Sequence, residues 1–205
     1  LNGSGNGIKT FQGLIRNLNQ INDIRINGGS IEIQNGGFIT PLSILPITAY
    51  MQTHALSCTY QDASGYLQKI QFPYCVDADR TKQVSGTYIP MTRVDLSSSP
   101  YHMNNQIASC SDTYLNLIHN NIINDPEFLE LIGKNVTGLL ISEMLDNVAE
   151  HSNSNSLFLF SQYYHAINSC EICLLDLGIG ILGSLYNAGR TDIINDKEAM
   201  ELVIE

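Results

Sequence analysis

The chain has 205 residues, with 10 Lys and Arg against 20 Asp and Glu, so its formal net charge is −10. This acidic balance argues against nucleic acid as the main partner, because contacts with a phosphate backbone need clustered cations. No stretch approaches the roughly 18 apolar residues of a membrane-spanning helix, so we expect no membrane association. The length suits one domain or two small ones with a real core.

Helical and strand-like patterns alternate in the first part of the chain. Apolar residues recur at helical spacing from residue 8 to 22, and short β-rich runs follow after glycine and asparagine turns. We therefore expect a small α/β unit over residues 1–76, which begins with a flexible Gly-rich terminus. Its expected elements are a helix over 8–22, a strand over 30–34, a helix over 41–54, a strand over 56–60 and a helix over 64–72.

The start of the 41–54 helix is marked by Thr40 and Pro41. A hydroxyl residue can cap the first turn, and proline at the first helical position loses no hydrogen bond. Pro46 further along is expected to kink or divide the helix. The order of elements resembles the STAS domains of anti-sigma-factor antagonists, although their D-S-S-G pattern is absent. That resemblance leaves two interpretations of Thr40, a plain helix cap or a phosphoacceptor.

The second half of the chain has longer patterns. Residues 77–104, rich in Asp, Ser, Pro and Gly and with one brief strand-like run, are predicted to link the first unit to a second over 105–205. The expected elements of the second unit are helices over 105–123 and 126–151, a hairpin of strands over 156–165 and 169–177, a polar glycine-spaced segment suggesting a mobile lid, and a helix over 196–204.

Five cysteines are scattered along the chain, at positions 58, 75, 110, 170 and 173, which suits a reducing, cytoplasmic setting. Cys170 and Cys173 form a C-x-x-C pair inside a predicted strand. Residues three apart in a strand point to opposite faces, so we expect buried thiols and not a zinc site.

Three polar residues of the 126–151 helix stand out by their spacing. Glu143, Asn147 and His151 lie at i, i+4 and i+8, which places them along one edge of a helix. A carboxylate and a carboxamide one turn apart can hold a hydrated divalent cation and a polarised water. After the hairpin, Asp176 ends an apolar strand and is followed by Gly178 and Gly180, which allow close approach of the backbone to a ligand.

These motifs together resemble the GHKL (Bergerat-fold) ATPases, the family of gyrase, Hsp90 and sensor histidine kinases. Its N-box, E-x-x-x-N, matches Glu143 and Asn147, and its first glycine box, D-x-G-x-G, matches Asp176, Gly178 and Gly180. The resemblance covers roughly residues 126–205. It implies a Bergerat-type α/β sandwich, which in the given chain stops before the family's second glycine box.

The resemblance also implies roles for these residues. Asp176 would bind the adenine amino group, with the two glycines beside the nucleotide. Asn147 would hold Mg²⁺, and Glu143 would act as general base. Two roles remain possible for His151. It contacts a phosphate, or it interacts with the last carbonyl groups of its own helix.

The expected function is therefore that of a Mg-ATP-binding module with ATP hydrolysis or phosphotransfer to a protein. Two alternatives remain, a nucleotide-gated interaction module without turnover and a purely structural protein-binding module. We expect an adenine nucleotide and a protein as partners, and leave homodimer formation open.

Overall fold

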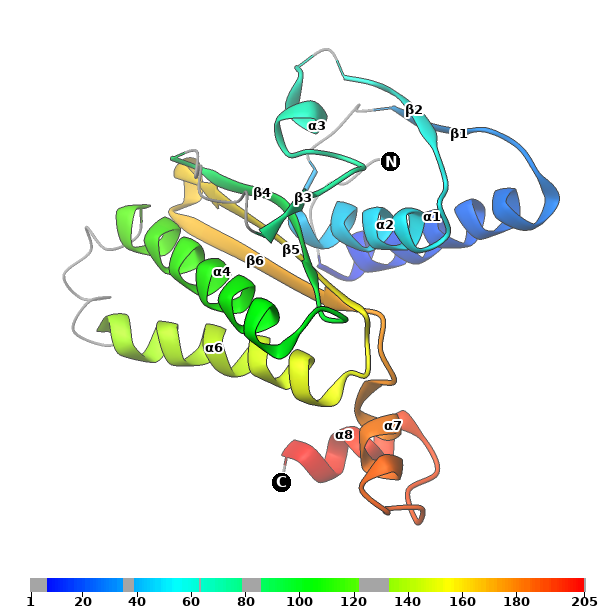
Figure 1. Ribbon diagram of the computed structural model, residues 1–205. Coiled ribbons are helices and arrows are strands. Elements are labelled where there is room, and N and C mark those ends of the chain that lie inside the picture. Colours follow the sequence, from blue (N-terminus) through cyan, green and yellow to red (C-terminus); the bar gives the residue numbers. More distant parts are fainter. Residues whose placement is uncertain (1–6, 35–38, 63, 79–85, 122–132, 205) are drawn as a thin grey trace.

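The structure is a computed structural model that describes residues 7–34, 39–62, 64–78, 86–121 and 133–204 (Figure 1). It has a four-stranded mixed sheet and a two-stranded parallel sheet with helices packed around them, so the expected mixed α/β class is confirmed. The helices are α1 (Gly7–Asn27), α2 (Pro41–Thr53), α3 (Tyr66–Lys69), α4 (Pro100–Asn121), α6 (Gly133–His151), the 3₁₀ helix η2 (His165–Ile167), α7 (Gly180–Asn187) and α8 (Asp196–Ile204). The strands are β1 (Ile31–Gln34), β2 (Cys58–Gln61), β3 (Val76–Asp77), β4 (Tyr88–Asp95), β5 (Ser156–Tyr164) and β6 (Ser169–Asp176).

The first sheet is a single parallel pair. β1 and β2 run parallel, with Ile31 opposite Cys58, and α2 forms the crossover between them. A crossover helix is the usual way to join two parallel strands. The helix runs from Pro41 to Thr53 without a break at Pro46. Pro46 costs it one backbone hydrogen bond, which so short a helix tolerates when its other side chains are buried.

The larger sheet has the strand order β3-β4-β5-β6. β3 and β4 are parallel, whereas β4 to β5 and β5 to β6 are antiparallel. The range 77–104, expected to be a linker, therefore supplies an inner strand, β4. Its side chains Ile89, Met91 and Val94 are buried against both faces of the sheet, which is why the strand forms despite the polar residues on either side of it.

Helices cover the larger sheet on both faces (Figure 1). α4 and α6 pack together on one face, and α2 packs against β5 and β6 on the other, with α1 on its far side. Successive side chains of β5 point to opposite faces of the sheet and enter two different cores. Leu157 and Leu159 enter the core with α4 and α6, whereas Phe158 and Phe160 enter the core with α1 and α2.

The two cysteines of β6 follow the same alternation. Cys173 packs with the core on the α2 side, and Cys170 packs with the core on the α4 side. The prediction that they point to opposite faces is confirmed. Burial raises the pKa of the Cys173 thiol to about 11 and also raises that of Cys170. Both thiols therefore stay protonated at neutral pH.

Several element boundaries differ from the expected ones. α1 continues to Asn27, and α4 begins at Pro100, where Ser99 accepts hydrogen bonds from the first turn. Serine before proline is the same cap pattern as Thr40 before Pro41, and it predicts that start. α6 begins at Gly133, and the rest of the expected 126–151 helix lies outside the described residues, as does the terminus over residues 1–6. Within the described parts, no helix is long and apolar enough to cross a membrane.

Candidate functional site

The carboxyl-terminal half of α6 forms one wall of the site. Ile141 and Leu145 are buried against α4 and the sheet, which turns the opposite edge of the helix to the surface. Glu143, Asn147 and His151 lie on that edge with exposed side chains. The helix forms as expected, but only part of its apolar face is buried, because Leu140 and Met144 are 58% and 49% exposed.

The end of β6 forms the second wall. Asp176 is the last residue of the strand, opposite Leu157 of β5. Its Oδ1 atom accepts a hydrogen bond from the Gly178 backbone N–H at 2.8 Å. This contact shapes the turn after the strand and holds the Asp176 carboxylate in one orientation.

The turn is joined to the end of α6 by close backbone contact. The Ile179 N–H donates to the Ser152 carbonyl at 2.8 Å, and the Ser184 hydroxyl donates to the His151 carbonyl at 2.8 Å. A Cβ atom on Gly178 would lie 1.9 Å from the Ser152 oxygen. Gly178 is therefore needed for this approach. Gly180 has a different reason to be glycine, since its φ is +65° and it starts α7.

A pocket of about 520 Å³ lies between these walls. The structure brings four of the predicted site residues to its lining: Asn147, His151, Asp176 and Gly180. Glu143 lies one helical turn before Asn147 and does not line the pocket, and Gly178 lies beside it against Ser152.

The apolar residues of the pocket lining were not predicted from the sequence. The further residues are Val148, Ser152, Ile181, Ser184, Leu185 and Val203. Ile181 and Leu185 lie one turn apart in α7, at the start of the segment that we expected to be a mobile lid. Their helical spacing is the sequence signal that predicts this helix. Val203 comes from α8, which packs on α7 (Figure 1), and no local pattern points to it.

The pocket offers a small set of polar groups beside apolar walls. In the described residues, the structure records no hydrogen-bond partner for the Asn147 amide or for Asp176 Oδ2. His151 Nε2 is 3.8 Å from Glu150 Oε2, but both side chains are well exposed, so this pair contributes little to stability. A carboxylate can accept from an exocyclic amino group, an amide oxygen can ligate a hard cation, and apolar walls suit a planar ring.

Comparison of the chain with protein-family models, with curated proteins and with solved structures gave no match.

Proposed function

We propose that the pocket between α6, β6 and α7 binds an adenine nucleotide with Mg²⁺, in the manner of the GHKL ATPases. One observation carries the proposal. Asn147 and Asp176 are 29 positions apart in the sequence, come from two unrelated patterns, and line the same pocket. The hairpin, which pairs Asp176 with Leu157 just after α6, brings the two motifs together, and the parts of one nucleotide site must meet in this way.

The proposed roles follow the chemistry of each group. Asp176 accepts a hydrogen bond from the adenine amino group, and its orientation is held by the Gly178 N–H. Ile181 and Leu185 cover the base. The Asn147 side-chain oxygen would hold Mg²⁺, which offsets the charge of the phosphates when bound.

The position of Glu143 favours the second candidate function, a module that binds nucleotide and a protein partner without turnover. Glu143 is exposed one turn from Asn147 and outside the pocket lining. A general base must lie within hydrogen-bond reach of the group it activates once substrate is bound. His151, at the other end of the edge, lines the pocket and is the closer candidate for a phosphate contact.

Calorimetry with ATP and ADP, with and without Mg²⁺, tests the binding proposal. We expect saturable heat that depends on Mg²⁺. No detectable heat for either nucleotide at millimolar concentration would overturn the proposal.

Two variants separate binding from chemistry. Asp176→Asn should weaken nucleotide binding about ten- to a hundred-fold, because it removes a charged acceptor worth roughly 1.5–3 kcal/mol. Asp112→Asn, an exposed change on α4, is the matched control and should bind like the parent. If the protein turns over ATP with Glu143 as the base, Glu143→Ala should keep binding and suppress ATP hydrolysis or phosphotransfer; under the second candidate function the parent itself shows no turnover. If the Glu143→Ala protein turns over ATP at the parent rate, Glu143 is not the base.

A further inference from the structure

A second pocket, of about 370 Å³, lies between the end of α2, β4 and the segment that leads into β5. Its lining includes Thr53 of α2, Arg93 of β4, Asn155, and Leu177 after β6. The volume falls within the range of pockets that hold small molecules. This pocket is lined by residues 153–156 and 177, among others, whereas the pocket beside α6 is lined by 147, 148, 151, 152 and 176. The two therefore lie on either side of the Ser152–Gly178 contact in the sequence and share no lining residue.

Arg93 supplies a positive charge to this pocket. Its Nε atom donates to Ser156 Oγ at 3.1 Å, which orients the guanidinium group and leaves the two terminal nitrogens for other acceptors. Among the described residues, the structure records no carboxylate within ion-pair distance of Arg93. In a chain with a net charge of −10, this exposed guanidinium group, bound to one hydroxyl and to no recorded carboxylate, can receive an anionic ligand.

The pocket wall around Arg93 is held in place by its own hydrogen bonds. The Ser154 hydroxyl donates to the Ser156 carbonyl at 2.8 Å and accepts from the Ser156 N–H at 3.3 Å. The backbone carbonyl of Asn155 accepts from Leu96, which ties this segment to the end of β4. The Asn155 side chain is exposed at the pocket edge and adds an amide donor.

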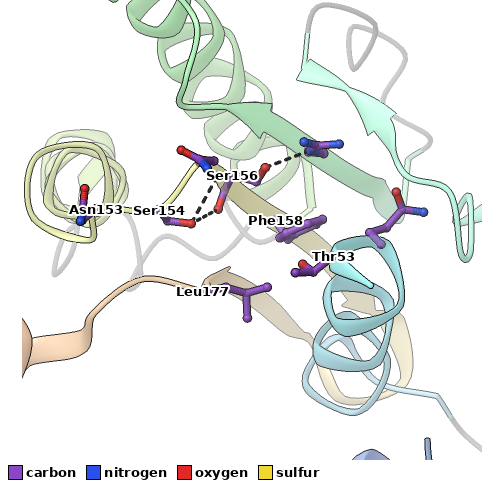
Figure 2. A pocket seen from close by; sticks show the side chains of 9 residues that line it. Thr53, Asn153, Ser154, Ser156, Phe158 and Leu177 are labelled. Atoms are coloured by element: carbon purple, nitrogen blue, oxygen red, sulfur yellow. Dashed lines mark hydrogen bonds between the residues drawn. The ribbon is translucent and has the colours of Figure 1, made fainter. Parts of the chain in front are cut away.

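Two apolar side chains also reach this pocket, although most of its lining, Gln52 and Asn153 included, is polar. Figure 2 shows Phe158 of β5, Leu177 and Thr53 around the same space, with Ser154 and Ser156 along its edge. Phe158 is 2% exposed and forms part of the core, whereas Leu177 is 48% exposed. The apolar surface open to a ligand is therefore mainly that of Leu177, which beside one oriented cation suits a small anion with a short apolar part.

We propose that this second pocket binds a small organic anion, with its carboxylate or phosphate on the Arg93 guanidinium and its apolar part on Leu177. The site does not depend on nucleotide binding, and a ligand there would contact both α2 and the segment that joins α6 to β5.

The test is a titration of isotope-labelled protein without nucleotide, followed by NMR. The probes are benzoate, phenyl phosphate and the neutral benzyl alcohol. We expect one or both anions to shift the amide signals of residues 153–156 and 177 in a saturable way, with Asn147 and Gly180 unmoved. The anion that binds more tightly shows whether the pocket prefers a carboxylate or a phosphate. Benzyl alcohol should bind at least about tenfold more weakly.

Two variants check the role of charge. Arg93→Gln should weaken the preferred anion by about tenfold or more, whereas Arg16→Gln, the same change on the exposed side of α1, should not. Asn155→Asp places a negative charge at the pocket edge without altering size, and should also weaken anion binding. The proposal is overturned by absence of saturable shifts with both anions, by equal binding of benzyl alcohol, or by parent-like affinity in Asn155→Asp and Arg93→Gln.

Discussion

At the scale of single residues, Gly178 has tightly constrained surroundings beside the pocket between α6, β6 and α7. The atom that an added Cβ would meet is a backbone oxygen, Ser152 O, which cannot rotate away. The turn after β6 would have to move away from the end of α6, which stretches the hydrogen bond from the Ile179 N–H to Ser152.

Gly178→Ala should therefore lower the free energy of unfolding by about 1–3 kcal/mol, as overpacking does elsewhere. Urea unfolding followed by circular dichroism measures it. Gly13→Ala is the control, because its Cβ would meet no atom within 4 Å inside α1, and alanine there should stabilise by roughly 0.5–1 kcal/mol. Equal effects of the two changes would show that the Ser152 contact is not tight in solution.

At the scale of elements, the start of α2 determines how this helix meets the larger sheet. Thr40 Oγ1 accepts from the Ser43 N–H at 3.2 Å, and Ser43 Oγ accepts from the Thr40 N–H at 2.9 Å. This reciprocal pair is a capping box. The Leu42 N–H, also in the first turn, donates a hydrogen bond of 3.0 Å to Oε1 of Glu171 in β6. The helix terminus thus binds the sheet directly.

Removal of the cap should weaken α2. We expect Thr40→Ala to lower the free energy of unfolding by roughly 0.5–2 kcal/mol, and Thr40→Ser to leave it nearly unchanged, since serine keeps the hydroxyl acceptor. Urea unfolding of the two variants beside the parent measures both. A Thr40→Ser protein as unstable as Thr40→Ala would mean that the methyl group, and not the hydroxyl, carries the effect.

The alternative interpretation of Thr40, as a phosphoacceptor, stays a hypothesis. A phosphate there would add negative charge to a helix start where the Glu171 carboxylate already accepts a backbone N–H, so the structure favours the cap. Intact-mass analysis of the protein incubated with Mg-ATP and cell extract decides between the two. Phosphate located at Thr40 would overturn the cap as its only role.

At the scale of the whole molecule, stability should depend on pH through its buried thiols. Burial raises the pKa of Cys75 to about 12, with Arg93 lowering it and Asp77 raising it by smaller amounts. The folded state therefore keeps the thiol proton that the unfolded chain loses above its ordinary pKa of 9.0. The contribution of this thiol to the free energy of unfolding is fully present below about pH 9 and is lost as the pH rises toward 12.

Cys75→Ala should make this loss shallower. Between its unfolded-state and folded-state pKa values, one such thiol lowers the free energy of unfolding by about 1.4 kcal/mol per pH unit. The free energy of unfolding of the variant should therefore fall less steeply by about that amount. Urea unfolding under reducing conditions at pH 7, 9.5, 10.5 and 11 gives the slopes, and the difference at pH 7 reports the packing change alone. Parallel curves for parent and variant would contradict the assignment.

The sequence by itself determined the class of the fold and the phases of its main elements. Apolar spacing predicted the helix α6 with Ile141 and Leu145 buried, although Met144 of the same apolar face is exposed. Strand alternation predicted opposite faces for Cys170 and Cys173. Both follow from periods of 3.6 and 2.0 residues, which are local properties of the chain. The motif spacing also selected Asn147, His151, Asp176 and Gly180, which the structure brings to one pocket.

Tertiary structure alone decided the rest, because it depends on residues that are distant in the chain. β4 became an inner strand through its pairing with β5, although polar sequence surrounds it. The need for glycine at 178 comes from Ser152, and the second pocket joins Thr53, Arg93, Asn155 and Leu177. Strand order and the meeting of distant backbones depend on how whole layers pack, and no local periodicity encodes them.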